Sequence, residues 1–404
     1  MKRICLTALS ALLILSAHSQ NISGSWKGVL NLGIQKLNIV FNIGTDGTCT
    51  LDSPDQGAKG LPAKLDYVSA DSLHISAPGL NMTYAGRLAD GVIQGKFTQN
   101  GMSLPLTLKP GMVEMRRPQT PKPPFPYQTE EVTFSNTAAG ATLAGTLTVP
   151  KDASTVVLMV TGSGQQNRDE ELMGHKPFAV IADFLARNGI ATLRYDDRGF
   201  GQSVGGDLKN ATTADFADDA AAGIEWLRKS GRFSRVGILG HSEGGSIAFL
   251  LGALQQVDFI VSLAGPAVKG DSIILEQFRA LSPTAQGLTL EQLREMPDIQ
   301  QALKDNAWYR HFFNYDPTAD ISRVTCAVLA VNGSRDLQVA SDQNLAALRR
   351  TLPANAKTVI REYPDLNHLF QHCQTGLPSE YGQIEETFAE EVLRDMVQWI
   401  RDIE

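Results

Sequence analysis

The sequence predicts a two-domain protein in which a small antiparallel all-β region precedes an α/β domain with a doubly wound, mostly parallel sheet. Residues 20–112 alternate apolar and polar side chains without a helical pattern. Residues 113–128 are rich in proline and indicate a linker between the domains. From residue 129 to residue 404, short apolar runs alternate with amphipathic helical stretches, which is the pattern of parallel strands joined by helices.

The all-β region is expected to form a small barrel or a curled sheet of about eight short strands. Every second residue between Leu37 and Ile43 is apolar, as in a strand with one buried face. Asp90-Gly91 and Asn100-Gly101 suit tight hairpins, because both central residues of such turns need positive φ. Ligand capture, dimerisation, covering of a site in the second domain and simple packing all stay open as roles for this region.

Five prolines lie between residues 118 and 126. Proline has no backbone N–H to donate to a sheet, and closely spaced prolines favour an extended, fairly stiff chain. We therefore expect a spacer here, with a polyproline ligand for a partner protein as the alternative.

Residues 1–19 have the features of a secretory signal peptide. Lys2 and Arg3 precede an apolar run from Ala8 to Ala17, and Ala17-His18-Ser19 provides a cleavage site with small residues at both ends. This run is too short to span a membrane, and no later stretch is long enough. We expect an exported protein, periplasmic or secreted, without a membrane span.

Composition and charge narrow the classes of partner. Hydrophobic residues make up 43% of the 404 residues and charged residues 20%, as in ordinary globular proteins. The formal net charge is −7, and no basic cluster is present, which argues against nucleic acid or an anionic membrane as a partner. Three well-separated cysteines follow the predicted signal peptide and are expected to be buried free thiols, although export would permit one disulfide: Cys49, Cys326 and Cys373.

A pentapeptide in the α/β domain indicates a catalytic nucleophile. Gly240-His241-Ser242-Glu243-Gly244 fits the pattern G-x-S-x-G and lies between an apolar strand-like run and an apolar helical run. A serine that leaves a strand and enters a helix within one residue needs a cramped backbone, and the flanking glycines remove the Cβ atoms that would collide there. The following N–H groups then lie at a helix N-terminus, where negative charge is favoured.

A serine nucleophile needs a histidine base and an acid that orients the histidine. In this kind of sheet the three follow the chain order serine, acid, histidine. Asp336 lies in a glycine-containing loop after the predicted strand 327–331, and His368 lies after the last predicted strand, 358–363. We therefore predict Ser242, Asp336 and His368 as the catalytic residues.

Two backbone N–H groups are expected to stabilise the oxyanion. One is the N–H of Glu243, directly after the nucleophile, and the other is the N–H of Ser163, with Gly162 or Gly164 as alternatives. For the Glu243 side chain we expect either binding of a substrate amine or an ion pair with Arg168 or Arg198.

Other titratable residues fit the catalytic roles less well. His372 follows His368 by one helical turn, His241 is expected to point away from the Ser242 hydroxyl, and His175 is expected to be a loop residue. Asp316 and Asp320 are expected to be structural. Metal-ligand spacings such as H-E-x-x-H and nucleotide-binding glycine motifs are absent from the sequence, so no metal and no cofactor is predicted.

An insertion at residues 268–318 interrupts the alternation of strands and helices. It carries two helical patterns, Asp271–Leu281 and Thr289–Lys304, followed by an aromatic cluster from Trp308 to Tyr315. We expect a lid over the site whose aromatic residues either form a substrate pocket or pack the lid onto the domain.

Together these motifs resemble the α/β-hydrolase superfamily. The residues that carry the resemblance to its serine aminopeptidase-like branch are Gly240 to Gly245, Asp196-Asp-Arg-Gly-Phe-Gly-Gln-Ser203, Thr161 to Glu170 and Asn332-Gly-Ser-Arg-Asp336. The chain is more closely similar to exported bacterial two-domain esterases of the EstD-like type. This resemblance implies a carboxylesterase acting on short to medium acyl esters.

Three functions follow as hypotheses. The leading one is hydrolysis of carboxylic esters through Ser242, His368, Asp336 and an acyl-enzyme. An aminopeptidase or another acyl hydrolase is the second. A lipid-binding or glycan-binding role that depends mainly on residues 20–112 is the third. The oligomeric state stays open.

Overall fold

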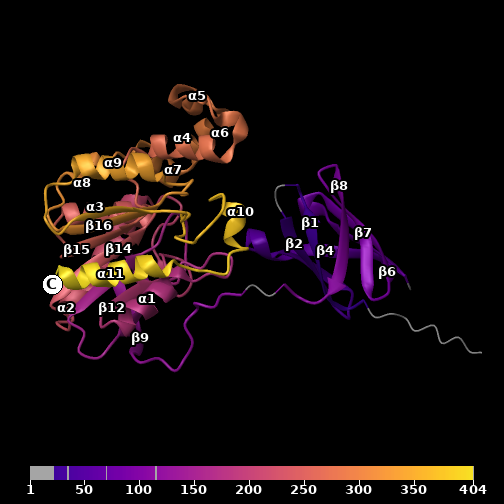
Figure 1. The fold of residues 1–404 in the computed structure, drawn as a ribbon, viewed down its shortest axis with the longest axis horizontal. Helices are drawn as coiled ribbons and strands as arrows, with labels where there is room; N and C mark the ends of the chain where they lie inside the picture. Colours follow the sequence, from indigo (N-terminus) through magenta and orange to yellow (C-terminus); the bar gives the residue numbers. More distant parts are fainter. Residues whose placement is uncertain (1–21, 34–35, 70, 114–115, 404) are drawn as a thin grey trace, which may run out of the picture. The chain divides into compact units, whose positions relative to one another are not determined.

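The computed structural model describes residues 22–33, 36–69, 71–113 and 116–403. It divides the chain into two compact units, residues 1–114 and residues 115–404 (Figure 1). The predicted signal peptide, residues 1–19, lies outside the described residues.

The first unit is a closed antiparallel barrel in which each strand pairs with the next and β1 pairs with β8. This confirms the predicted all-β fold. Asp90 and Gly91, and likewise Asn100 and Gly101, have positive φ, as the predicted hairpin turns require. The strands are β1 Gly24–Asn31, β2 Lys36–Ile43, β3 Thr48–Ser53, β4 Ala58–Val68, β5 Ser72–Ala77, β6 Met82–Ala89, β7 Val92–Gln99 and β8 Met102–Pro110.

Side chains fill the barrel interior. Along the strands, alternate side chains face inward. They form one apolar cluster that includes Phe41, Ile75 and Ile93. The buried Tyr84 hydroxyl lies 3.1 Å from two acceptors, the carbonyl oxygens of Ile93 and Leu106. A barrel packed in this way has no room for a lipid or glycan along its axis.

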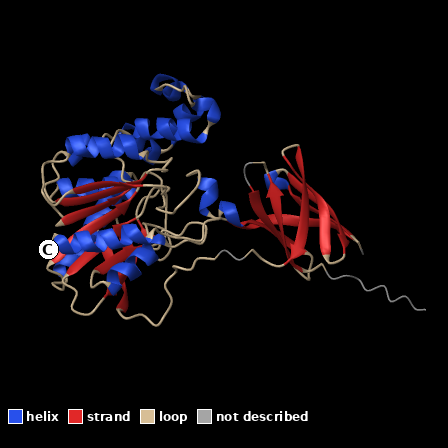
Figure 2. Cartoon of the chain, viewed as in Figure 1, coloured by secondary structure: helices blue, strands red, loops and turns tan. Residues whose placement is uncertain are grey.

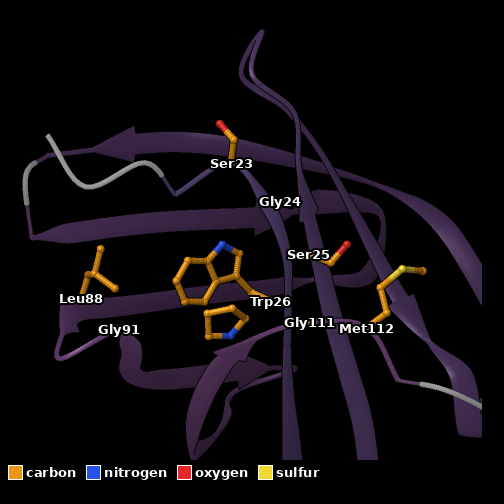
Figure 3. A pocket seen from close by; sticks show the side chains of 9 residues that line it. Ser23, Gly24, Ser25, Trp26, Leu88, Gly91, Gly111 and Met112 are labelled. Atoms are coloured by element: carbon orange, nitrogen blue, oxygen red, sulfur yellow. The ribbon is translucent and has the colours of Figure 1, made fainter.

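A cavity of about 700 Å³ lies in the barrel unit and is lined in part by Trp26 and Leu88, which belong to the interior cluster (Figure 3). Trp26, Leu88 and Met112 contribute apolar side chains to its lining, and Ser23 and Ser25 contribute hydroxyl groups. The indole N–H of Trp26 donates to the carbonyl oxygen of Ile22 at 2.7 Å, so this ring is held in place at the cavity wall.

The proline-rich segment is anchored to the second unit along its described part. The Arg117 guanidinium donates to the carbonyl oxygens of Met173 and Gly382, each at 2.8 Å. The Gln119 amide donates to the carbonyl oxygen of Phe388 at 2.7 Å. The segment thus behaves as part of the second unit at these residues, whereas the sequence suggested a spacer.

The second unit contains a nine-stranded, mostly parallel sheet with the order β13-β10-β12-β11-β14-β15-β16-β17, and β9 pairs with β10. Strand β10 pairs antiparallel with β9, β12 and β13. The strands in the order β12-β11-β14-β15-β16-β17 pair in parallel. The strands are β9 Gln128–Asn136, β10 Ala141–Val149, β11 Thr155–Val160, β12 Ala191–Tyr195, β13 Val204–Gly205, β14 Arg235–His241, β15 Phe259–Leu263, β16 Ala327–Gly333 and β17 Val359–Tyr363.

Helices cover both faces of this sheet (Figure 2). One apolar core joins the sheet to α2, α3 and α9, and a second core on the other face joins it to α1 and α11. The prediction of a doubly wound fold is therefore confirmed. These helices are α1 Pro177–Arg187, α2 Thr213–Lys229, α3 Glu243–Ala253, α9 Ser341–Thr351 and α11 Glu390–Asp402, and a short helix, α10 Pro378–Tyr381, precedes α11.

The insertion between β15 and β16 is helical and has its own apolar core. The predicted helix over residues 289–304 is two helices, because Pro297 cannot continue the first and begins the second. A capping box between Thr289 and Gln292 is present at the start of the first of these helices. The helices are α4 Gly270–Leu281, α5 Leu290–Glu295, α6 Pro297–Asp305, α7 Ala307–Asn314 and α8 Thr318–Ile321.

Cys49 is buried, whereas Cys326 and Cys373 are only half-buried, and all three are free thiols. Among the described residues, no helix combines the length and apolar character needed to cross a bilayer.

Candidate active site

Ser242 lies on a sharp turn between β14 and α3. Its φ of 53° and ψ of −121° are unusual for a residue with a Cβ, as expected for a nucleophile held on a strained turn. A Cβ on Gly240 would lie 1.9 Å from the carbonyl oxygen of Gly244, and a Cβ on Gly244 would lie 2.2 Å from the carbonyl oxygen of Val160. Both glycines are therefore required for the close approach of the backbone at this turn.

His368 and Asp336 are in direct contact. Asp336 follows β16 and His368 follows β17, so the ends of neighbouring parallel strands bring them together. The Nδ1 atom of His368 lies 2.8 Å from Oδ2 of Asp336, and both side chains are buried. Asp336 also accepts hydrogen bonds from the N–H groups of Gln338 and Val339, at 2.8 and 2.9 Å. This network fixes the orientation of the imidazole ring and directs its Nε2 atom away from Asp336.

Ser242 and His368 line one cavity of about 440 Å³, at the carboxyl ends of the strands. Within the described residues, no hydrogen bond joins the Ser242 hydroxyl to His368. Serine–histidine contacts in unliganded sites are often long and tighten when substrate binds. Of the three predicted catalytic residues, the structure thus joins two directly and places the third in the same cavity.

The predicted oxyanion loop lies against the nucleophile. A Cβ on Gly162 would lie 3.1 Å from the Cβ of Ser242. The Gly162 N–H donates to Oε1 of Glu170 at 2.8 Å and is therefore occupied. This leaves the N–H groups of Ser163 and Gly164 as candidates in the loop, together with the Glu243 N–H in the first turn of α3, where helical N–H groups have no intrahelical acceptor.

The Glu243 side chain does neither of the two things expected from the sequence. It is 2% exposed, and its carboxylate accepts hydrogen bonds from the Thr213 hydroxyl and the Trp308 indole. Arg168 instead pairs with Asp196, and Arg198 pairs with Asp219. Burial raises the pKa of Glu243, and the bonds from Thr213 and Trp308 partly offset that effect.

His241 and Glu170 form a buried contact that the sequence analysis missed. The Nδ1 atom of His241 lies 2.9 Å from Oε1 of Glu170, and Nε2 lies 2.9 Å from the carbonyl oxygen of His368. The residues are 71 positions apart, and although Glu170 ends the Thr161 to Glu170 motif, that motif does not indicate which residue Glu170 contacts. Of the two residues, only His241 could be singled out from the sequence, because it directly precedes the nucleophile.

The rival residues lie elsewhere. His372 is exposed and contacts Glu386 and Glu391. His175 lies in the loop before α1, as expected, and is buried, with its Nδ1 atom 2.9 Å from the Thr387 hydroxyl. Asp320 accepts hydrogen bonds from Tyr315 and Arg323, as a structural residue does. Among the residues that the structure describes, no group of three or more His, Cys, Asp or Glu side chains is arranged to hold a metal ion.

The chain is similar in sequence to one described protein family and to two named proteins. Residues 175–368 match the family described as serine aminopeptidase, S33. Esterase EstD of Thermotoga maritima is 28% identical over 274 residues, which cover 63% of this chain and 66% of that protein. An acyl transferase of Shewanella hanedai is 27% identical over 157 residues, covering 38% and 47%. The chain thus spans just under two thirds and about half of the lengths of these relatives.

Solved structures with a similar arrangement include both esterases and a peptidase. A Pyrococcus furiosus esterase is 15% identical, with a TM-score of 0.48, over 72% of this chain and 99% of that one. A Mycobacterium smegmatis proline iminopeptidase is 16% identical, with a TM-score of 0.47, over 68% and 98%.

The sheet order and the turn at Ser242 give residues 115–404 the α/β-hydrolase fold, and residues 175–368 lie within the part of this fold that matches the serine aminopeptidase, S33, family. The chain is similar to the serine aminopeptidase family and to the esterase EstD of Thermotoga maritima, which confirms the resemblance inferred from the motifs.

Proposed function

We propose that the protein hydrolyses carboxylic esters through Ser242, His368 and Asp336. The observation that carries this proposal is the buried Asp336–His368 contact, at 2.8 Å, beside a cavity that Ser242 also lines. A serine on a strained turn, a histidine fixed by a carboxylate and a neighbouring helix N-terminus are together the parts needed for acyl transfer.

In the proposed mechanism, the Ser242 Oγ attacks the ester carbonyl and its proton passes to Nε2 of His368. Asp336 stabilises the imidazolium that forms, and the N–H groups of Glu243 and Ser163 bind the oxyanion. The carbon–oxygen bond to the alcohol breaks, and His368 returns the proton to the leaving alkoxide. Water then attacks the acyl-enzyme with His368 again as the base, which releases the acid and regenerates Ser242.

The carboxylates of the site favour an ester over a peptide with a free amino terminus as the substrate. Glu243 is buried and bonded to Thr213 and Trp308, and Glu170 is bonded to His241, so neither is available for a substrate ammonium group. The carboxylate of Glu171 at the cavity rim lies 3.3 Å from Nζ of Lys176. An aminopeptidase would need an acidic group free to bind the amine.

The cavity lining favours small, uncharged acyl groups. Its volume is about 440 Å³, and neither lysine nor arginine is among its described lining residues. Uncharged amides lie beside an apolar wall, so an anionic acyl group would lack a counter-charge. The amides are Gln165, Gln166, Gln277 and Gln338, and the apolar residues are Leu172, Pro266, Ile273, Ile274, Trp308, Phe312, Val339 and Leu369.

A substrate panel on the purified protein tests this proposal. Turnover of p-nitrophenyl acetate and butyrate should exceed turnover of aminoacyl-p-nitroanilides by orders of magnitude in kcat/KM. The Ser242→Ala variant should lose the ester activity and keep its thermal unfolding transition. Faster cleavage of the anilides would establish the peptidase alternative, and full esterase activity in Ser242→Ala would exclude the proposed nucleophile.

We also propose that the protein is exported, on the basis of Lys2, Arg3 and the apolar run that follows them. Expression of the full chain in a Gram-negative host, followed by intact-mass measurement of the periplasmic fraction, tests this. A protein that begins at Gln20 supports cleavage after Ser19, and an uncleaved protein confined to the cytoplasm contradicts export.

A further inference from the structure

A second acid–histidine contact lies next to the proposed catalytic residues. Glu170 and His241 are 4% and 6% exposed, and the mechanism uses neither side chain. Their contact, 2.9 Å between Oε1 and Nδ1, adjoins the triad, because the rings of His241 and His368 lie 4.7 Å apart between centroids.

The partners of His241 determine its protonation. Nε2 faces the carbonyl oxygen of His368 at 2.9 Å, and a carbonyl can only accept, so Nε2 carries a proton. Nδ1 faces Oε1 of Glu170, and that oxygen already accepts the N–H of Gly162 at 2.8 Å. An oxygen that accepts from a backbone N–H is best suited to accept from Nδ1 as well. Both ring nitrogens are then protonated, and the contact is an imidazolium–carboxylate pair.

The charges around this pair agree with that assignment. Burial lowers the pKa of His241, but the Glu170 charge and the hydrogen bonds to Glu170 and the His368 carbonyl outweigh it, so the pKa lies above its usual value. The groups that face the pair are His368 and Asp336 on the imidazole side and Asp197 on the side of Glu170. A neutral imidazole would leave the Glu170 carboxylate buried without a counter-charge, which is costly.

The pair joins the two halves of the proposed site. His241 donates to the backbone of His368 itself, and Glu170 accepts from Gly162, whose backbone lies beside Ser242. Glu170 therefore holds the backbone directly before Ser163, whose N–H is the proposed oxyanion donor in the loop. One charged contact thus ties the base, the loop that binds the oxyanion and the residue before the nucleophile.

We propose that Glu170 and His241 form a buried ion pair of positioning residues, which holds the His368 backbone and the Gly162–Ser163 loop in register with Ser242. The inference rests on the proposed function, because it assumes that Ser242 and His368 perform the chemistry. Misplacement of reacting groups by about 1 Å can cost about 100-fold in rate.

Nuclear magnetic resonance of the wild-type protein tests the charge state independently of activity. The chain has seven histidines, and in 15N-histidine-labelled protein the His241 signals are those missing from His241→Asn. Two protonated ring nitrogens are expected in the pH range just above about 6.5, where an isolated imidazole becomes neutral. A single protonated nitrogen at His241 in that range would overturn the ion pair.

Glu170→Gln and Glu170→Asp separate charge from shape. One Glu170 oxygen serves both His241 and Gly162, so glutamine, which has the same size, cannot supply the negative charge that the imidazolium needs. We expect kcat to fall about 100-fold in Glu170→Gln with KM changed little, and to fall less in Glu170→Asp, which keeps the charge. A Glu170→Gln enzyme as active as wild type, or more active than Glu170→Asp, would overturn the proposal.

The pH profile distinguishes this role from a merely structural one. Without the carboxylate, the buried imidazole of His241 becomes neutral, and His368 loses a nearby cation that opposes its protonation. The acid limb of kcat/KM in Glu170→Gln should therefore move to higher pH. Asp219→Asn breaks the similarly buried Arg198–Asp219 pair and should destabilise the fold without moving that limb. An unmoved limb in Glu170→Gln would contradict the proposal, whereas an active Ser242→Ala would instead contradict the proposed function.

Discussion

The indole N–H of Trp308, on lid helix α7, lies 2.8 and 3.0 Å from the two carboxylate oxygens of Glu243, the residue directly after Ser242. The Thr213 hydroxyl, in the first turn of α2, donates to the same carboxylate. The lid is therefore tied to the turn that carries the nucleophile by a buried, hydrogen-bonded carboxylate.

Trp308→Phe should destabilise the protein, because it removes one donor from a buried carboxylate and keeps an aromatic ring next to Phe312. We expect a loss of about 1–3 kcal/mol in the free energy of unfolding, and a lower kcat. Urea denaturation and ester hydrolysis measure the two effects. Tyr309→Phe, on the same helix, is the control and should change both much less. Equal stability of Trp308→Phe and wild type would show that the bond to Glu243 contributes nothing.

Alanine at Gly240 should disrupt the turn at Ser242. The added Cβ would collide with the Gly244 carbonyl oxygen, which belongs to a backbone confined between β14 and α3. We expect the free energy of unfolding to fall by about 3 kcal/mol or more. We also expect the esterase activity to be lost. Gly287→Ala is the control, because its Cβ would meet no atom within 4 Å. Thermal unfolding compares the two, and a stable, active Gly240→Ala would be inconsistent with the close approach described here.

Asp197 should make stability fall as pH rises through the neutral range. Burial raises its pKa from 3.8 to about 8, with partial compensation by hydrogen bonds from Gln166 and Thr161. Between these two values the folded state holds a proton that the unfolded state has lost, so stability is greatest below about pH 4 for this group and is lost up to about pH 8.

Asp197→Asn removes that contribution. The unfolding free energy of the variant, relative to wild type, should increase with pH at up to about 1.4 kcal/mol per pH unit within this window. Urea titrations at several pH values provide the comparison. A difference between variant and wild type that does not change with pH would mean that Asp197 is ionised in the folded protein.

Phe312 is expected to limit the length of the acyl chain. Both Phe312 and its neighbour Phe313 belong to the apolar core of the insertion, but of the two only Phe312 lines the cavity. Phe312→Leu should raise the ratio of kcat/KM for p-nitrophenyl octanoate over acetate by about 10-fold, as expected for one or two methylene groups of added room. Phe313→Leu is the control, because it is the same substitution on the same helix, and it should leave the ratio unchanged. Similar ratios in the two variants would argue against a pocket at Phe312.

Periodicity and turn residues predicted the architecture well, because these signals are local. The alternation of apolar residues in β2 and the positive-φ dipeptides after β6 and β7 predicted the barrel. The strand–turn–helix pattern around Ser242 predicted the fold of the second unit. The single long helix expected over residues 289–304 was wrong, although Pro297 was a visible signal for the break.

Contacts between distant segments were harder to predict. The order of Ser242, Asp336 and His368 along the chain was informative, because parallel strands end at one edge of the sheet. Nothing local marks Glu170 as the partner of His241, or Trp308 as the partner of Glu243, since each contact depends on how a loop or a lid folds back. The anchoring of Arg117 on backbone carbonyls was hidden for the same reason.

The most direct test of the central claim is the reaction of the full-length protein with a fluorophosphonate, followed by intact-mass measurement and peptide mapping. The account predicts one adduct per chain, on the peptide that contains Ser242, with labelling abolished in Ser242→Ala and strongly slowed in His368→Ala. Labelling of another residue, or an unlabelled wild-type protein that still hydrolyses esters, would contradict it.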